Sequence, residues 1–242
     1  MAGMDPATDF TVHRIACGSL KRLPHPTWPC ELWSYRPGPW QPPAEGTHYG
    51  AVFSGRLTLR CRSGVFEIGA GMVFCVPGEL ALHGEGEAFG ITHLRSKGFF
   101  QIAGPIEASG RLRYIDGCTD SLLIAPQVRG DPCLNHLHFP PRTDQTLHTH
   151  PSLRAGLIAR GRGVCRLGDR RVPLSPGLVF HLPPGSKHAF QTEAESMDVV
   201  AFHPDSDFGP VHDDHPMINR TIVDGISARH VERIRTAEQP NE

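Results

Sequence analysis

The sequence predicts an all-β protein built from two similar units, and three observations lead to this prediction. The chain has 26 glycines and 23 prolines, scattered along its length rather than gathered in one tract. Both residue types interrupt helices and punctuate short strands. Between them lie short apolar runs such as residues 155–159, 163–167, 171–174 and 178–182, with a turn-like Gly168-Asp169 pair between the second and third. The third observation is an internal repeat.

The repeat is seen in two pairs of segments. Residues 55–60 resemble residues 161–166, and residues 71–77 resemble residues 177–183, each pair being offset by 106 positions. Gly50 and Gly156 fall on the same offset, as do Phe74 and Phe180. Because repeated short strands without intervening amphipathic helices are typical of sandwiches and barrels, we expect two copies of one antiparallel unit, either a sandwich or a barrel.

Composition excludes several classes of function. Lys and Arg number 24 against 25 Asp and Glu, a net charge of −1, which argues against nucleic-acid binding and against a basic membrane-binding surface. No apolar run reaches the roughly 18 residues of a membrane-spanning helix, and the acidic start is unlike a secretory signal. The seven cysteines include no C-x-x-C pair, so we expect buried thiols in a cytoplasmic protein rather than disulfides or a zinc ribbon. No phosphate-binding loop or dinucleotide fingerprint is present, and hence no residues for an organic cofactor.

Histidines gather in the second half of the chain. Nine of the 15 lie between His136 and His215. His148 and His150 stand two residues apart, so an extended backbone directs both rings to one side. His188 follows a Pro-Pro-Gly turn that can bring in a third ring. Three imidazoles leave coordination positions open on a transition metal, as in catalytic sites.

The spacing of these residues resembles a known family. The run Arg142-x5-His148-x-His150-x3-Arg154-x6-Gly161, followed by Gly177-x5-Pro183-x-Gly185-x2-His188, resembles the two cupin motifs, G-x5-H-x-H-x3,4-E-x6-G and G-x5-P-x-G-x2-H-x3-N. Three residue types depart from the motifs, namely Arg142, Arg154 and Thr192. The resemblance is strong over residues 142–192 and weaker, through the repeat, over residues 42–86.

The resemblance implies a bicupin, two jelly-roll barrels with few short helices. We expect an N-terminal extension (1–26), a first cupin without metal ligands (27–125), a metal-binding cupin (126–210) and a C-terminal segment (211–242). The first copy carries Pro42, Ala44 and Leu82 at the positions of the three histidines. We therefore expect one divalent transition metal per chain, held by His148, His150 and His188. Fe(II) is expected first, although imidazole ligands also suit Zn, Mn, Ni or Cu.

Arg154 occupies the position at which the family often has a fourth ligand. A guanidinium has no lone pair to donate, so we expect a fixed positive charge that binds a substrate carboxylate. The alternative is a salt bridge on the barrel wall. His138 shares one strand face with His136 and is expected in the same cavity as a catalytic residue, the alternative being a pair of buried structural histidines. The roles of His181, His203, His212 and His215 stay open at this point.

By resemblance to non-haem iron cupin dioxygenases, the leading hypothesis is an Fe(II)-dependent oxygenase. Its partners would be dioxygen and a small, anionic molecule such as a carboxylate. One alternative is a lyase or isomerase in which the metal polarises a carbonyl without redox chemistry. Another is a ligand-sensing cupin without catalysis. A homodimer is implied by the resemblance alone, and neither nucleic acid nor a membrane is expected as a partner.

Overall fold

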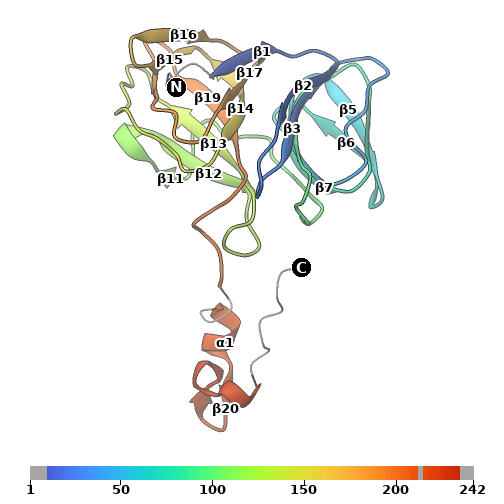
Figure 1. The fold of residues 1–242 in the computed structure, drawn as a ribbon, viewed down its shortest axis with the longest axis vertical. Helices are drawn as coiled ribbons and strands as arrows, with labels where there is room; N and C mark the ends of the chain where they lie inside the picture. Colours follow the sequence, from blue (N-terminus) through green and yellow to red (C-terminus); the bar gives the residue numbers. More distant parts are fainter. Residues whose placement is uncertain (1–9, 212–214, 235–242) are drawn as a thin grey trace, which may run out of the picture.

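Two β-barrels lie next to each other in the structure, a computed structural model that describes residues 10–211 and 215–234 (Figure 1). The first barrel has a six-stranded sheet of order β10-β7-β4-β9-β3-β2 and a three-stranded sheet of order β6-β5-β8. Its strands are β2 (Gly18–Leu23), β3 (Cys30–Tyr35), β4 (Thr47–Ser54), β5 (Arg56–Cys61), β6 (Gly64–Gly69), β7 (Val73–Pro77), β8 (Leu80–His83), β9 (Glu87–His93) and β10 (Gln101–Ala103).

The second barrel has a seven-stranded sheet of order β1-β17-β14-β19-β13-β12-β11 and a three-stranded sheet of order β16-β15-β18. All of the strand pairs within these sheets are antiparallel. Its strands are β1 (Thr11–Arg14), β11 (Leu112–Arg113), β12 (Thr119–Ile124), β13 (Cys133–Phe139), β14 (Arg154–Gly161), β15 (Gly163–Leu167), β16 (Arg170–Leu174), β17 (Leu178–Leu182), β18 (Ala189–Gln191) and β19 (Met197–His203).

Helices are few and short, as expected. The described residues hold one α-helix, α1 (Pro216–Arg220), and short 3-10 turns at Ile115–Gly117, Ala228–His230 and Glu232–Ile234. The helix and the hairpin of β20 (Ile222–Val223) and β21 (Ile226–Ser227) extend away from both barrels (Figure 1). The all-β jelly-roll class predicted from the sequence is therefore confirmed.

The repeat seen in the sequence is also present in the strand order. β7, β4 and β9 are neighbours in one large sheet as β17, β14 and β19 are in the other. Gly50 pairs with Phe74 across β4 and β7, and Gly156 pairs with Phe180 across β14 and β17. A Cβ at Gly156 would lie 2.9 Å from the Phe180 ring, and one at Gly50 would lie 2.4 Å from the Phe74 ring. Each glycine therefore makes room for the aromatic ring that fills its barrel.

Three hydrophobic clusters hold the layers together. One fills the first barrel and another fills the second. The third lies between the two large sheets, where Tyr49 of β4 contacts Phe202 of β19 with 5.1 Å between ring centroids. This shared cluster joins the barrels into one packed body, because its members come from both sheets.

The sheets draw strands from beyond the ranges expected for each barrel. β1, from the expected N-terminal extension, pairs with β17 of the second barrel, while β2 pairs with β3 of the first. β11 and β12, from the range expected for the first cupin, pair with each other and β12 pairs with β13. The four-part division of the chain itself stays a prediction.

Candidate metal centre

Three histidine rings meet at the mouth of the second barrel. His148, His150 and His188 each offer a ring nitrogen, and these nitrogens all lie within 4.8 Å of one another. The ring centroids are 5.0 Å apart for His148 and His150, 4.5 Å for His148 and His188, and 5.2 Å for His150 and His188. The structure thus brings together the three side chains that the spacing singled out. They form the only such group among the described residues.

Backbone hydrogen bonds fix the two segments that carry these rings. The N–H of His148 donates to the carbonyl of His188 at 2.9 Å, and the N–H of His188 donates back to the carbonyl of His148 at 2.9 Å. The N–H of Gly185 donates to the carbonyl of His150 at 2.8 Å. The Pro-Pro-Gly turn is therefore attached directly to the His-x-His segment, which explains why the third ring approaches the first two.

Hydrogen bonds also determine which nitrogen of each ring is left for a metal. Nδ1 of His148 lies 2.8 Å from the carbonyl oxygen of Thr146, and Nδ1 of His188 lies 2.9 Å from the carbonyl oxygen of Ser186. A carbonyl only accepts, so each Nδ1 carries the proton and each Nε2 keeps its lone pair. Metal-binding histidines in proteins are oriented in this way.

Burial keeps two of the rings, His150 and His188, neutral. Burial lowers the pKa of His150 to about 3, assisted by the positive charge of Arg154. Burial likewise lowers the pKa of His188 to about 4. Neutral imidazole is the form that binds a metal ion, so these residues fit a transition-metal site.

Arg154 lies beside the histidines and is largely buried. Its side chain is 13% exposed, and its Nη1 donates to Ser152 Oγ at 2.6 Å and to the carbonyl of Leu153 at 2.9 Å. The carboxylate of Asp205 lies 4.0 Å from Nη1 and also accepts a hydrogen bond from Ser152. Nε is buried and has no partner among the described residues. The guanidinium is thus held in place from one side while a donor stays available.

Two cavities share the wall formed by His150, Arg154 and His203. The inner cavity, inside the barrel, measures about 30 Å³ and is lined mainly by apolar side chains together with the three histidines. That is roughly the volume of one water molecule. The outer cleft measures about 460 Å³ and is lined also by Cys133, Asn135 and the segment 205–208. An organic ligand therefore fits the outer cleft, whereas the inner cavity has room only for a molecule of two or three atoms.

His138 does not belong to this site, contrary to the prediction. Leu137 and Phe139 of β13 line the inner cavity, and alternation along the strand turns His136 and His138 to the opposite face. There, both rings bond to the carboxylate of Asp198, at 2.8 Å and 2.9 Å. The two histidines share a strand face, as expected, but it is not the face of the metal centre.

The remaining histidines have separate places. His203 lines both cavities, whereas His181 is buried opposite Thr11 on β1, on the face of β17 away from the barrel interior. His215 accepts a hydrogen bond from the N–H of Met217 as the N-cap of α1. His212 lies outside the described residues.

Sequence reasoning missed two polar residues that line the inner cavity, Tyr114 and Gln145. Gln145 stands three positions before His148, and its side chain accepts from the N–H of Phe190 at 3.1 Å. Its place between Arg142 and His148, inside the first of the two motifs, was a usable signal. Tyr114 comes from the region between the two repeats, and no pattern in the sequence connects it with the site.

Comparison with known families identifies the domain that holds this centre. Residues 135–217 match the family model described as a cupin domain. The second barrel is a cupin. The matched cupin range contains all three histidines, Arg154 and His203, so the candidate site lies within the part of the chain that the family defines.

Solved structures extend the likeness to most of the chain. A cupin 2 conserved barrel domain protein from Leptotrichia buccalis aligns with a TM-score of 0.56 at 15% identity, covering 81% of this chain and 88% of that one. A putative glyoxylate-induced protein from Pseudomonas aeruginosa aligns with a TM-score of 0.56 at 16% identity, covering 84% and 83%. A salicylate 1,2-dioxygenase variant from Pseudoaminobacter salicylatoxidans aligns with a TM-score of 0.53 at 10% identity, covering 74% and 70%. At these identities the likeness concerns the fold.

No significant match was found among curated proteins. Among the helices of the described residues, none has the length and apolar character needed to cross a membrane.

Proposed function

We propose that this cupin is a metal-dependent enzyme acting on a small anionic molecule, and specifically an Fe(II)-dependent oxygenase. The observation that supports it is the combination of three converging imidazoles with a buried, positively charged Arg154 between a small apolar cavity and an open cleft. Arg154 replaces the acidic fourth ligand expected from the family motif, so the ion would keep more open positions than a four-ligand site.

The chain's own residues would bind the metal ion, bind the substrate and exclude bulk water. His148, His150 and His188 would hold the ion through Nε2, with Thr146 and Ser186 orienting two of the rings. Bound Fe(II) would supply the redox chemistry for reaction with dioxygen. Arg154 would bind the substrate carboxylate in the outer cleft through its unpartnered Nε, a charge-assisted bond strengthened by burial. The apolar walls of the inner cavity would exclude bulk water and leave room for a diatomic gas.

Gentisate is a suitable first substrate to test. One structure of the salicylate 1,2-dioxygenase holds gentisate, a small aromatic carboxylate of the charge that Arg154 would bind. We would load the purified protein anaerobically with Fe(II), add gentisate, salicylate or an aliphatic thiol carboxylate, and follow dioxygen with an electrode. We expect consumption of dioxygen in proportion to the substrate converted.

Matched variants make the result decisive. Arg154→Gln should lower kcat/KM at least tenfold, while Arg142→Gln, which changes an exposed arginine near the motif, should leave it unchanged. Turnover with Zn(II) and without dioxygen would instead favour the lyase or isomerase alternative. Saturable binding of substrate without turnover under any metal would favour the sensing alternative. A cytoplasmic location and a homodimer stay predictions.

A further inference from the structure

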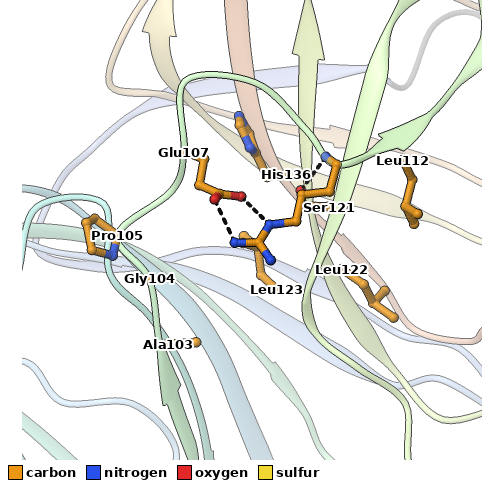
Figure 2. A pocket seen from close by; sticks show the side chains of 10 residues that line it. Ala103, Gly104, Pro105, Glu107, Leu112, Ser121, Leu122, Leu123 and His136 are labelled. Carbon is orange, nitrogen blue, oxygen red and sulfur yellow. Dashed lines mark hydrogen bonds and ion pairs between the residues drawn. The ribbon is translucent and has the colours of Figure 1, made fainter.

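A third cavity lies on the opposite face of β13 from the metal centre. It measures about 580 Å³, and its lining comes from both barrels: Ala103 from the end of β10, Pro105 and Glu107 from the segment that follows, Ser121 and Leu123 from β12, and His136 from β13 (Figure 2). It shares no lining residue with the inner cavity at the metal centre and only Leu122 with the outer cleft.

A buried charge cluster lies behind this cavity. The carboxylate of Asp198, 4% exposed, accepts hydrogen bonds from His136 Nε2 at 2.8 Å, His138 Nδ1 at 2.9 Å and Arg160 Nε at 3.0 Å. The carboxylate only accepts, so the Nε2 of His136 is the donor, and in the imidazole form of the ring Nδ1 keeps a lone pair. That Nδ1 is buried and has no hydrogen-bond partner among the described residues. An unsatisfied buried acceptor of this kind is costly and calls for a donor.

A hydroxyl donor stands on the neighbouring strand. Ser121 lies directly opposite His136 in the pairing of β12 with β13, so the two side chains share one face of the sheet. Ser121 Oγ accepts from the N–H of Arg111 at 2.9 Å, and among the described residues its own O–H donates to no partner. The cavity therefore offers an acceptor next to a donor. A single hydroxyl group, which both donates and accepts, complements this pair.

The charges around the cavity are balanced. Glu107 binds Arg111 through two bonds of 2.7 Å, and Arg160 bonds both Asp198 and the carbonyl oxygen of Glu107. Two carboxylates are thus matched by two guanidinium groups, and the surroundings give no net preference for an ionic ligand. The side chains of Ala103, Pro105, Leu112, Leu122 and Leu123 supply apolar walls.

We propose that this cavity is a second ligand site, for an uncharged molecule that carries a hydroxyl group on an apolar body, such as an alcohol or a phenol. The ligand hydroxyl donates to Nδ1 of His136 and accepts from Ser121, and the apolar body contacts the leucine and proline walls. His136 is 0% exposed in this conformation. The Arg111 side chain is 76% exposed in its ion pair with Glu107. Exposed ion pairs of this kind contribute little to stability, so a ligand can displace the Arg111 side chain from Glu107.

Phenol is the probe, compared with anisole, which lacks the donor, and benzoate, which carries a charge. Each would be titrated into the full-length, metal-loaded protein and followed by NMR at the backbone amides of Arg111, Ser121 and His136. These signals report this cavity and not the metal centre, so the result does not depend on the proposed oxygenase activity. We expect saturable shifts with phenol and at least tenfold weaker binding of both anisole and benzoate.

Variants connect the binding to the two polar groups. His136→Phe and Ser121→Ala should each weaken phenol binding at least fivefold, whereas His83→Phe, on the exposed end of β8, should not. If His136→Phe does not fold, Ser121→Ala and the ratio of phenol to anisole affinity decide the matter. Absence of phenol binding at these amides, equal binding of phenol and anisole, or tighter binding of benzoate would each overturn the proposal.

Discussion

The rings of His148 and His188 are oriented by carbonyl oxygens two residues before each of them, at Thr146 and Ser186. The same offset in both segments means that each ring is held by its own stretch of backbone. The third ring, His150, is positioned instead through the bond between its carbonyl and Gly185. This arrangement makes the site dependent on backbone groups rather than on other side chains.

Removing any one of these rings should abolish tight metal binding. We expect one equivalent of bound metal per wild-type chain and less than about 0.1 equivalent for His148→Ala or His188→Ala, because two ligands on a labile ion bind far more weakly than three. Elemental analysis after dialysis against excess Fe(II) or Zn(II) measures this. His83→Ala, an exposed histidine outside the site, should keep the full equivalent. Full occupancy in the His188 variant would rule out this ligand set.

Asp198 is a single residue to which three others bond, His136, His138 and Arg160. Burial alone would raise the pKa of its carboxyl, but hydrogen bonds from His136 and His138 and the charge of Arg160 outweigh burial and hold the pKa below its usual value. A lowered pKa in the folded state means that this carboxylate stabilises the protein above the unfolded-state pKa of about 4, and that the contribution is lost as the pH falls through the folded-state value.

We therefore expect Asp198→Asn to destabilise the protein at pH 7 by about 2–4 kcal/mol, because three donors lose a charged acceptor in a buried place. Urea unfolding of both proteins measures the difference. The difference in unfolding free energy between the two proteins should become smaller below pH 4, where the wild-type carboxyl group takes up a proton. A constant gap from pH 7 to pH 3 would contradict this reading.

At the scale of single elements, the paired glycines of β4 and β14 determine how closely each strand approaches its neighbours. A Cβ at Gly156 would lie 2.6 Å from the carbonyl oxygen of Val200 in β19, and one at Gly50 would lie 2.6 Å from that of Phe89 in β9. The backbone cannot give way without breaking the ladder. Gly69, by contrast, has its nearest atom at 3.9 Å.

Gly156→Ala should accordingly cost about 2–3 kcal/mol of unfolding free energy, in the range of overpacked core substitutions. Gly69→Ala should change it by less than about 0.5 kcal/mol, as is usual for substitutions that meet no constraint. Denaturant titrations of the three proteins under one condition test the comparison. Similar stabilities for the two variants would mean that β14 can shift away from β19.

A buried histidine in β4 gives the first barrel a response to acid. His48 lies 2.8 Å from the hydroxyl of Thr92 and 2.7 Å from the carbonyl of Gly78. Burial lowers the pKa of His48 to about 4, partly offset by the Gly78 carbonyl. As the pH decreases, the unfolded chain binds this proton near pH 6.5 and the folded chain only near pH 4. The free energy of unfolding therefore decreases as the pH is lowered from about 6.5 to about 4.

His48→Gln should flatten this dependence. We expect the wild-type protein to lose roughly 2 kcal/mol more than the variant between pH 6.5 and pH 4, in keeping with ~1.4 kcal/mol per pKa unit reduced by partial relaxation. Unfolding free energies measured at intervals of half a pH unit give the slope. Parallel curves for the two proteins would show that another group accounts for the acid response.

The sequence identified local patterns well and long-range contacts poorly. The strands 163–167 and 178–182 and the turn between β15 and β16 follow from short glycine-bounded runs, and the structure has them there. The three histidines were found because their spacing constrains one turn and one extended segment. The strands and the turn depend on residues close together in the chain, whereas His188 stands 40 positions after His148 and was found through its place in the second motif.

His138 shows where such reasoning fails. It alternates with Leu137 and Phe139, so either set can face the barrel, and only the packing of β13 against β12 and β19 decides between them. The greater apolar character of Leu137 and Phe139 was the available signal. The role of Asp198 could not be predicted, because its partners lie about 40 to 60 residues away in the sequence and no local motif includes it.

For the whole molecule, the cluster between the two large sheets predicts that both barrels unfold together. All three tryptophans, Trp28, Trp33 and Trp40, lie in the first half of the chain, so their fluorescence reports the first barrel. Circular dichroism at far-ultraviolet wavelengths reports both. We expect the two signals to give coincident urea transitions, as for a single cooperative unit.

Weakening the shared cluster should shift both transitions equally. Tyr49→Ala, which removes the ring against Phe202, should cost about 3–5 kcal/mol, the usual range for a large buried ring. Ser63→Ala, at an exposed turn, is the matched control. Separation of the fluorescence and dichroism midpoints in the Tyr49 variant would indicate that each barrel is stable without the other.

The pairing of β1 with β17 also bears on how the chain is made. During translation Thr11 leaves the ribosome long before its partner His181, and the edge of β17 that it will occupy does not yet exist. The first barrel can close on the nascent chain, but its neighbour must wait until most of the polypeptide has emerged. The pairing of β1 with β17 joins residues that are far apart in the sequence. Contacts of this kind slow folding. Refolding from denaturant should therefore finish with the docking of this first strand.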